Sequence, residues 1–167
     1  DRSRAVTEVT VYTADRPGLF SRIAGAMAVS GASIVDARIF NLANGKALDS
    51  FWVQDAEGGV FDRPDRLARL EAAIEESLEG RLEPDVELAG RRVLSRRLRA
   101  FEVPPRVLID NKASAEHTVI EVNGRDRPGL LYDMTRAVAD LGLQISSAKI
   151  STYGERVVDV FYVRDAF

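Results

Sequence analysis

The sequence has no cysteine and a single histidine among its 167 residues. Disulfide bonds, iron–sulfur clusters, cysteine-ligated zinc and histidine-rich metal sites are therefore excluded. No apolar run approaches the ~18 residues of a membrane-spanning helix, and no basic segment leads into an apolar signal sequence. The net charge of −3 is small and negative, which argues weakly against nucleic acid as a partner. We expect neither a membrane nor a nucleic-acid partner.

The remaining composition is that of a small globular protein, with 46% apolar and 29% charged residues. The length fits one ordinary domain or two small ones, and it is enough to bury a core without disulfide bonds. Since the first residue is Asp1 rather than methionine, we expect the chain to be part of a longer protein. A cytoplasmic location fits these features best.

One five-residue motif occurs twice. The segment Asp15–Leu19 reads Asp-Arg-Pro-Gly-Leu, and Asp126–Leu130 repeats it residue for residue. When the two halves are aligned on this motif, apolar and acidic positions on both sides also match. With one turn residue deleted, Asp49 meets Asp159. Because the two halves keep one register on both sides of the motif, the sequence indicates a duplication.

Each copy predicts the order strand, helix, strand, strand. In the first copy, alternating residues predict strands over 9–12 and 35–39, and apolar residues at helical spacing predict a helix that Gly31 ends. The pair Asn44-Gly45 signals a tight turn into a third strand over 47–53. That strand is apolar on both faces, so we expect both sides of the sheet to be covered.

The first copy continues beyond its third strand. An apolar stripe over 63–79 predicts a helix, and Gly80 closes it. A polar, basic insertion follows over 81–105, and residues 106–111 then predict a fourth strand. Nothing corresponding to this helix and strand follows in the second copy, which stops at Phe167.

The predicted fold class is α+β, with two ferredoxin-like βαββαβ units in tandem. Each unit is an antiparallel sheet with helices on one face, and side-by-side packing of the units closes an open face or edge. The first unit spans residues 1–111 and includes the basic insertion. The second spans 112–167 and is truncated after its third strand, so its fourth-strand position should be empty or filled by another chain.

A strand that ends in Asp-Arg-Pro-Gly-Leu, followed by a helix and an Ala-x-Ile strand, resembles the ACT domain family of amino-acid-sensing regulatory modules. The tandem pair, with its basic spacer and the segment Val157–Val163, also looks like the C-terminal region of the bacterial uridylyltransferase/uridylyl-removing enzymes that modify the nitrogen regulator PII. This resemblance implies glutamine or a related amino acid as the ligand, and control of nitrogen assimilation. It also implies N-terminal catalytic domains and PII as partners, and Mg²⁺ as a cofactor of the longer enzyme.

The catalytic signatures of such an enzyme are absent from these residues. Its nucleotidyltransferase part needs a Gly-Ser turn and an Asp-x-Asp pair, and its hydrolase part needs His-Asp metal ligands. The sequence contains none of these, and its one histidine, His117, precedes Thr118. We therefore expect no catalytic residue, no cofactor and no metal within the chain itself.

The repeated turn is the candidate ligand site. Free N–H groups at the helix start that follows it would receive a carboxylate, with Pro17 in the first helical turn. The side chain of Asp15 is suited to an ammonium group, that of Arg16 to a carboxylate, and that of Gln144 to an amide. The predicted ligand-binding residues are Asp15, Arg16, Gly18, Leu19, Phe20, Asp126, Arg127, Gly129, Leu130, Leu131 and Gln144.

Several alternatives stay open at this point. Asp15 is also a suitable helix cap, and Gln144 an ordinary polar residue of a strand. The arginines between Arg91 and Arg99 are suited to docking phosphate or to forming one face of a short amphipathic helix. The whole chain is alternatively a stand-alone amino-acid-binding module, or one that forms a homodimer through its ACT sheets.

Overall fold

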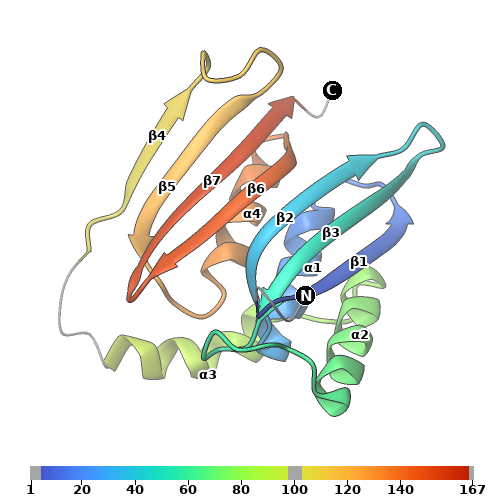
Figure 1. Ribbon diagram of the computed structural model, residues 1–167, viewed down its shortest axis with the longest axis vertical. Helices are drawn as coiled ribbons and strands as arrows, with labels where there is room; N and C mark the ends of the chain where they lie inside the picture. The colour runs from blue at the N-terminus through green and yellow to red at the C-terminus, as the bar shows by residue number, and fades with distance from the viewer. Residues whose placement is uncertain (1–4, 98–102, 166–167) are drawn as a thin grey trace.

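The computed structural model describes residues 5–97 and 103–165, and for residues 92–97 the backbone alone. Its elements confirm an α+β fold (Figure 1). In chain order they are β1 (Thr7–Ala14), α1 (Leu19–Ser30), β2 (Ser33–Asn41), β3 (Lys46–Gln54), α2 (Pro64–Leu78), α3 (Pro84–Arg97), β4 (Arg106–Asp110), β5 (Thr118–Arg125), α4 (Leu130–Asp140), β6 (Leu143–Tyr153) and β7 (Arg156–Asp165). No helix within these described residues is long and apolar enough to cross a membrane.

The strands form one seven-stranded antiparallel sheet in the order β1-β3-β2-β6-β7-β5-β4. The two copies meet where β2 pairs with β6, and Ala37 lies opposite Ala148, its equivalent in the repeat. This self-matching contact relates the copies by an approximate two-fold axis. The small side chains at the axis let the two helices above it, α1 and α4, pack against each other.

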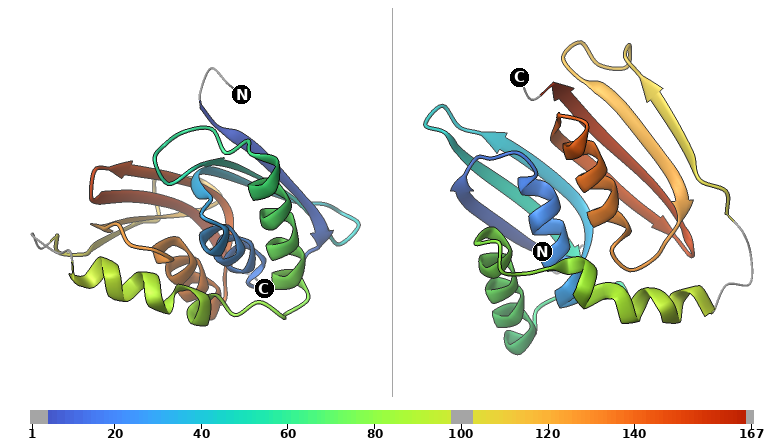
Figure 2. Two further views of the ribbon diagram at one scale, coloured as in Figure 1. Left: turned by 90° about the horizontal axis from the view of Figure 1, so that it is seen from below. Right: turned by 180° about the vertical axis from the view of Figure 1, so that it is seen from behind.

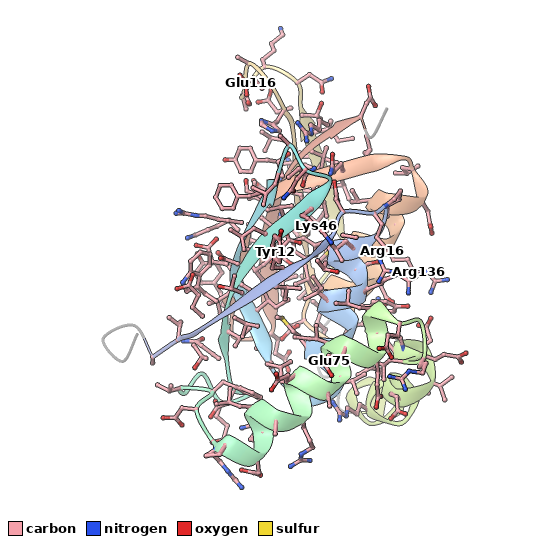
Figure 3. The ribbon with its side chains drawn as sticks, turned by 90° about the vertical axis from the view of Figure 1, so that its right-hand side faces the viewer. Tyr12, Arg16, Lys46, Glu75, Glu116 and Arg136 are labelled. Atoms are coloured by element: carbon pink, nitrogen blue, oxygen red, sulfur yellow. The ribbon has the colours of Figure 1, made fainter. Side chains whose placement is uncertain are left out.

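The helices lie on one face of the sheet, and nothing covers the other face among the described residues (Figures 2 and 3). The expectation that both faces are covered is therefore wrong. Along β3, buried residues alternate with half-buried ones, as in a sheet with one open face. The units join edge to edge, so neither covers the sheet of the other. On the open face, the Arg38 guanidinium lies 5.6 Å from the Trp52 ring centre, which partly screens that apolar side chain.

The core lies between the sheet and the helices. Phe51 of β3 and its equivalent Phe161 of β7 are fully buried, and the ring of Phe20 meets Phe51 edge to face at 5.3 Å. A glycine permits the closest helix contact. A Cβ on Gly25 of α1 would lie 3.0 Å from the Tyr132 ring of α4 and 2.6 Å from the ring of Pro84 at the start of α3.

The strand predicted to complete the first copy belongs instead to the second half of the sheet. β4 pairs with β5 over its whole length, with Val107 opposite Val122. The second copy therefore has four strands, and β1 is the free edge of the first copy. Two predictions are wrong: that 106–111 closes the unit 1–111, and that the fourth-strand position of the second unit is empty or filled by another chain.

The basic insertion explains why β4 joins the second copy. It contains α3, a longer helix than expected, which carries the chain away from the first copy. α3 runs beneath the sheet from the first copy toward the second (Figure 2). The Arg91 guanidinium donates hydrogen bonds to the carbonyls of Ala28 and Val29 at the end of α1, at 3.0 and 2.9 Å. Near its start, Asp85 pairs with Arg136 of α4 at 2.7 Å. Arg91 thus joins two helices. The arginine side chains that follow lie outside the described residues.

Candidate ligand-binding site

Each Asp-Arg-Pro-Gly-Leu motif forms a tight turn that opens a helix. In the first, the Leu19 N–H donates to the Arg16 carbonyl at 3.2 Å, and Gly18 has a φ of 75° and a ψ of 11°. These are the features of a type II turn, which needs a residue with positive φ after its proline. The second turn matches, with a bond of 3.1 Å and a glycine φ of 77°. Pro17 therefore precedes the helix, and its predicted place in the first helical turn is wrong.

The helix starts that follow these turns have no side-chain cap. The N-cap residue of α1 is Gly18, so the alternative that Asp15 caps this helix is wrong. The backbone of Asp15 is held instead by its N–H, which donates to the Gly45 carbonyl at 3.0 Å. Uncapped first-turn N–H groups carry the positive end of the helix dipole. Both turns therefore offer donors for an anion.

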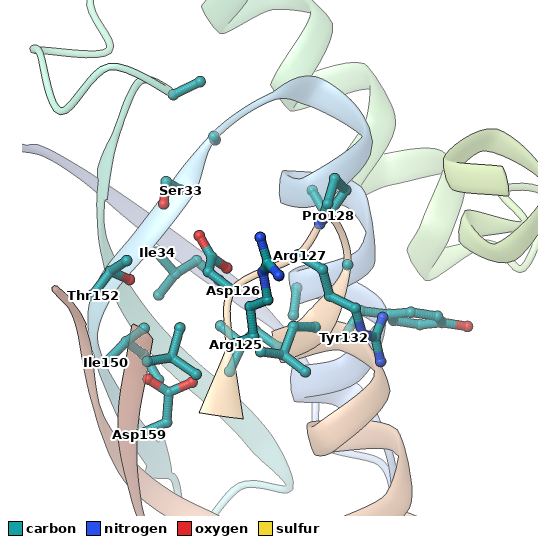
Figure 4. A pocket seen from close by; sticks show the side chains of 18 of the residues that line it. Ser33, Ile34, Arg125, Asp126, Arg127, Pro128, Tyr132, Ile150, Thr152 and Asp159 are labelled. Atoms are coloured by element: carbon teal, nitrogen blue, oxygen red, sulfur yellow. The ribbon is translucent and has the colours of Figure 1, made fainter. Parts of the chain in front are cut away.

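Two cavities, each lined by one whole motif, lie among those between the copies. The first-turn pocket, of about 260 Å³, lies between the first motif and residues 142–145 of the second copy. The second-turn pocket, of about 650 Å³, lies between the second motif and residues 31–34 of the first copy (Figure 4). The segments 31–34 and 142–145 are equivalent in the repeat, so the approximate two-fold axis that relates the copies also relates the pockets. Each pocket needs both copies.

The structure distributes the predicted ligand-binding residues over both pockets. Those that line the first-turn pocket are Asp15, Arg16, Gly18, Leu19, Phe20 and Gln144. Those that line the second-turn pocket are Asp126, Arg127, Gly129, Leu130 and Leu131. Gln144 is thus brought beside a motif that precedes it by more than a hundred residues. The binding of a ligand by these residues stays a prediction.

Other groups of the protein already hold the two motif arginines. Arg16 lies on the helix side of the sheet (Figure 3), where its guanidinium donates to the Leu78 carbonyl at the end of α2. Its Nε is buried and has no partner among the described residues. Arg127 forms an ion pair of 2.6 Å with Asp133 of α4. Neither arginine therefore presents its whole guanidinium to a ligand, although Arg16 was expected to hold a ligand's carboxylate.

Two buried aspartates were not among the predicted site residues. Asp49 on β3 is 1% exposed and lines the first-turn pocket, and Asp159 on β7 is 2% exposed and lines the second (Figure 4). They are equivalent in the repeat. The signal was present in the sequence, since an aspartate stands at the same place in an otherwise apolar strand of both copies.

Burial raises the pKa of both carboxyl groups to about 7. For Asp49, the negative charge of Asp15 raises the pKa further. The Phe40 amide lowers the pKa of Asp49, although it does not form a hydrogen bond of normal geometry with the carboxyl group. For Asp159, the Ser151 N–H donates a hydrogen bond of 3.3 Å that lowers the pKa, while Asp126 raises it. Each pocket therefore contains a carboxyl group that titrates near neutral pH.

Comparison with known proteins agrees with this architecture. A family model described as an "ACR9-like, ACT-like domain" matches residues 106–166. The match begins at the first residue of β4, which is consistent with the pairing of that strand with the second copy. The ferredoxin-like, ACT-type fold expected from the resemblance is confirmed.

Three relatives share high identity over nearly the whole chain, and each is a "Bifunctional uridylyltransferase/uridylyl-removing enzyme". The chain is 63% identical to that of Azospirillum brasilense over 100% of its length and 18% of the relative. It is 64% identical to that of Gluconobacter oxydans, over 97% of the chain and 17% of the relative. It is 55% identical to that of Rhodospirillum rubrum, over 100% of the chain and 18% of the relative. The chain thus spans less than a fifth of the length of the curated relatives it matches.

Proposed function

We propose that this ACT-type chain, similar along its length to one stretch of the bifunctional uridylyltransferase/uridylyl-removing enzymes, is the amino-acid-sensing regulatory region of such an enzyme. The observation that carries the proposal is the position of the two pockets. Each joins the turn of one copy to a strand start of the other. A ligand bound in either pocket would contact both units at once, so its binding energy would depend on how the units pack.

The groups around the first-turn pocket suit an α-amino acid. Uncapped N–H groups at the start of α1 would receive the α-carboxylate, and acidic side chains would receive the α-ammonium. Gln144 on the opposite wall would contact a side-chain amide, although its Oε1 already accepts hydrogen bonds from Arg164 at 3.2 and 3.3 Å. This set of groups supports glutamine as the ligand.

Regulation would follow from a change in the packing of the units. A ligand shifts an equilibrium between two arrangements only by the difference in its affinity for them. Coupling of ~1–3 kcal/mol is the usual scale for such regulation. The longer enzyme would transfer and remove uridylyl groups on PII through N-terminal catalytic domains, in response to glutamine and hence to nitrogen supply.

Magnesium belongs to the catalytic part of this proposal. Over residues 5–97 and 103–165, no group of three or more histidine, aspartate or glutamate side chains is placed to hold a metal ion. These described residues therefore offer no group that fits Mg²⁺.

Calorimetric titration of the chain with glutamine tests the proposal, with glutamate and alanine titrated in parallel. We expect saturable binding of glutamine and weaker binding of glutamate, which lacks the amide. The variant Asp62→Asn, at an exposed position away from both pockets, should bind glutamine like the unaltered chain. If no amino acid binds at millimolar concentration, the chain is not an amino-acid sensor, and the alternative of a dimerising interaction module is favoured.

A further inference from the structure

The carboxyl group of Asp49 has no hydrogen bond of normal geometry with the residues that the structure describes, although the Phe40 amide lies near enough to lower its pKa. Both of its oxygens are buried, and neither makes a hydrogen bond with any of the described residues. An ionised carboxylate in this position is strongly unfavourable unless a cation accompanies it. Below its raised pKa of about 7, the side chain therefore keeps its proton unless a cation from outside the chain pairs with it.

No cationic group among the residues that the structure describes serves as that partner. Besides Asp49, the charged side chains that line the first-turn pocket are Asp15 and Arg16, both from the turn. Asp15 repels a negative charge on Asp49, and the guanidinium of Arg16 is turned to the end of α2, where it bonds the Leu78 carbonyl. The pocket wall next to Asp49 is therefore net negative once both acids ionise.

The other described residues that line the pocket around Asp49 add no further titratable group. β1 and β2 place Val11 and Ile39 directly across from it in the sheet. α4 contributes Thr135, whose hydroxyl donates to the carbonyls of Leu131 and Tyr132 within its own helix. β6 contributes the neutral amide of Gln144. An incoming cation would therefore find a buried carboxyl group on which the Phe40 amide acts without normal hydrogen-bond geometry.

The second-turn pocket differs at the equivalent position. Asp159 accepts a hydrogen bond of 3.3 Å from the Ser151 N–H, whereas the equivalent Phe40 amide acts on Asp49 without normal hydrogen-bond geometry. Arginines also line its pocket, among them Arg125 and Arg127 (Figure 4). A cation would therefore be stabilised less beside Asp159 than beside Asp49. The two pockets differ in this respect, although their residues are equivalent in the repeat.

We propose that Asp49 is the residue that recognises the ammonium group of the amino acid in the first-turn pocket, and that it releases its proton to solvent as the ammonium binds. In this exchange a neutral carboxyl group becomes a carboxylate paired with the ligand's ammonium, and one proton passes to the buffer. The inference rests on the proposed function and deepens it. It requires a ligand with a cationic group and excludes carboxylic acids that lack one.

The affinity should then depend on pH, because burial raises the pKa of Asp49 to about 7. At pH 8 the group is already mostly ionised, and at pH 6 it must lose its proton before it can pair. The affinity of the first-turn pocket is therefore expected to be about tenfold weaker at pH 6 than at pH 8.

The test is calorimetric titration with glutamine at pH 6 and pH 8, in two buffers of different ionisation enthalpy. We expect close to one proton to be released per ligand at pH 6 and almost none at pH 8. The compound 4-carbamoylbutanoate, which is glutamine without its ammonium group, should show no saturable binding at the concentrations at which glutamine binds. Asp49→Asn should bind glutamine at least tenfold more weakly at pH 8 and without proton release, whereas Asp159→Asn should keep both the release and its pH dependence.

Two outcomes would overturn the inference. If Asp49→Asn, shown by thermal unfolding to be folded, binds glutamine as the unaltered chain does, then Asp49 is not the ammonium partner. If glutamine binds at pH 6 without releasing a proton, the exchange does not occur. In both cases the proposed function stands, because an amino acid still binds. If no amino acid binds at all, the proposed function fails, and the inference fails with it.

Discussion

Replacing Asp49 by asparagine should change how the stability of the protein depends on pH. Burial, and secondly the charge of Asp15, raises the pKa of the Asp49 carboxyl from 3.8 to about 7. Between these values the folded chain keeps a proton that the unfolded chain has lost. The stability from this group is therefore fully present below the unfolded pKa and is lost as the pH rises through the folded one.

The size of this effect follows from the two pKa values. One pKa unit corresponds to ~1.4 kcal/mol. Across the interval from pH 5 to pH 8, Asp49 alone should lower the free energy of unfolding by about 3 kcal/mol. Asparagine has nearly the same shape and does not ionise. Any penalty for its unpartnered amide does not vary with pH. Relative to the unaltered protein, Asp49→Asn should therefore gain about 3 kcal/mol over this interval.

Urea denaturation followed by circular dichroism at pH 5, 6, 7 and 8 measures this difference. Asp62→Asn is the matched control, because it makes the same chemical change at an exposed position. Subtracting the curves of the unaltered protein removes the effects of all other titrating groups. A difference between Asp49→Asn and the unaltered protein that stays constant from pH 5 to pH 8 would show that Asp49 titrates as in the unfolded chain, and would refute the reasoning.

Gly25→Ala should lower the free energy of unfolding by ~1–3 kcal/mol, because its Cβ would lie 2.6 Å from the ring of Pro84. A Cβ at Gly90 would meet open space, so Gly90→Ala should raise the free energy of unfolding by up to ~1 kcal/mol. If urea denaturation showed the same change in stability for both variants, the close packing of α1 at Gly25 would be contradicted. The double substitution Asp15→Ala, Asp126→Ala should weaken glutamine binding in calorimetry while changing stability by no more than ~1 kcal/mol, because neither carboxyl group caps the helix that follows it. An unchanged affinity in the folded variant would place the ligand elsewhere.

The local structure of both copies could be predicted from the sequence because it depends on residues that are close together in the chain. The Pro17-Gly18 pair sets a turn wherever it stands, since only the glycine accepts the positive φ that the turn requires. Gly31 ends α1 with a φ of 73° in the same way. The helix predicted over 63–79 is α2, Pro64–Leu78. The two candidate ligand-binding turns could be predicted from the sequence for the same reason, because each depends only on neighbouring residues.

The position of β4 could not be predicted from the same information. Its residues 106–110 form a strand as expected, but β1 and β5 are equivalent strands that offer the same backbone groups at their edges. An alternation of residues does not distinguish two such edges. The path of α3 makes the choice, through contacts of Asp85 and Arg91 with helices that lie far from them in the sequence.

The sequence by itself determined the duplication, the ACT-type fold and the repeated turn, because a repeat and a turn are properties of the order of residues. Only the tertiary structure decided what surrounds each turn. It placed Gln144 opposite Asp15 across the junction of the copies, and it buried Asp49 beside that turn without a hydrogen bond of normal geometry to any described residue. The charge state of a carboxyl group depends on the water and the charges around it. Those surroundings exist only after distant segments have come together.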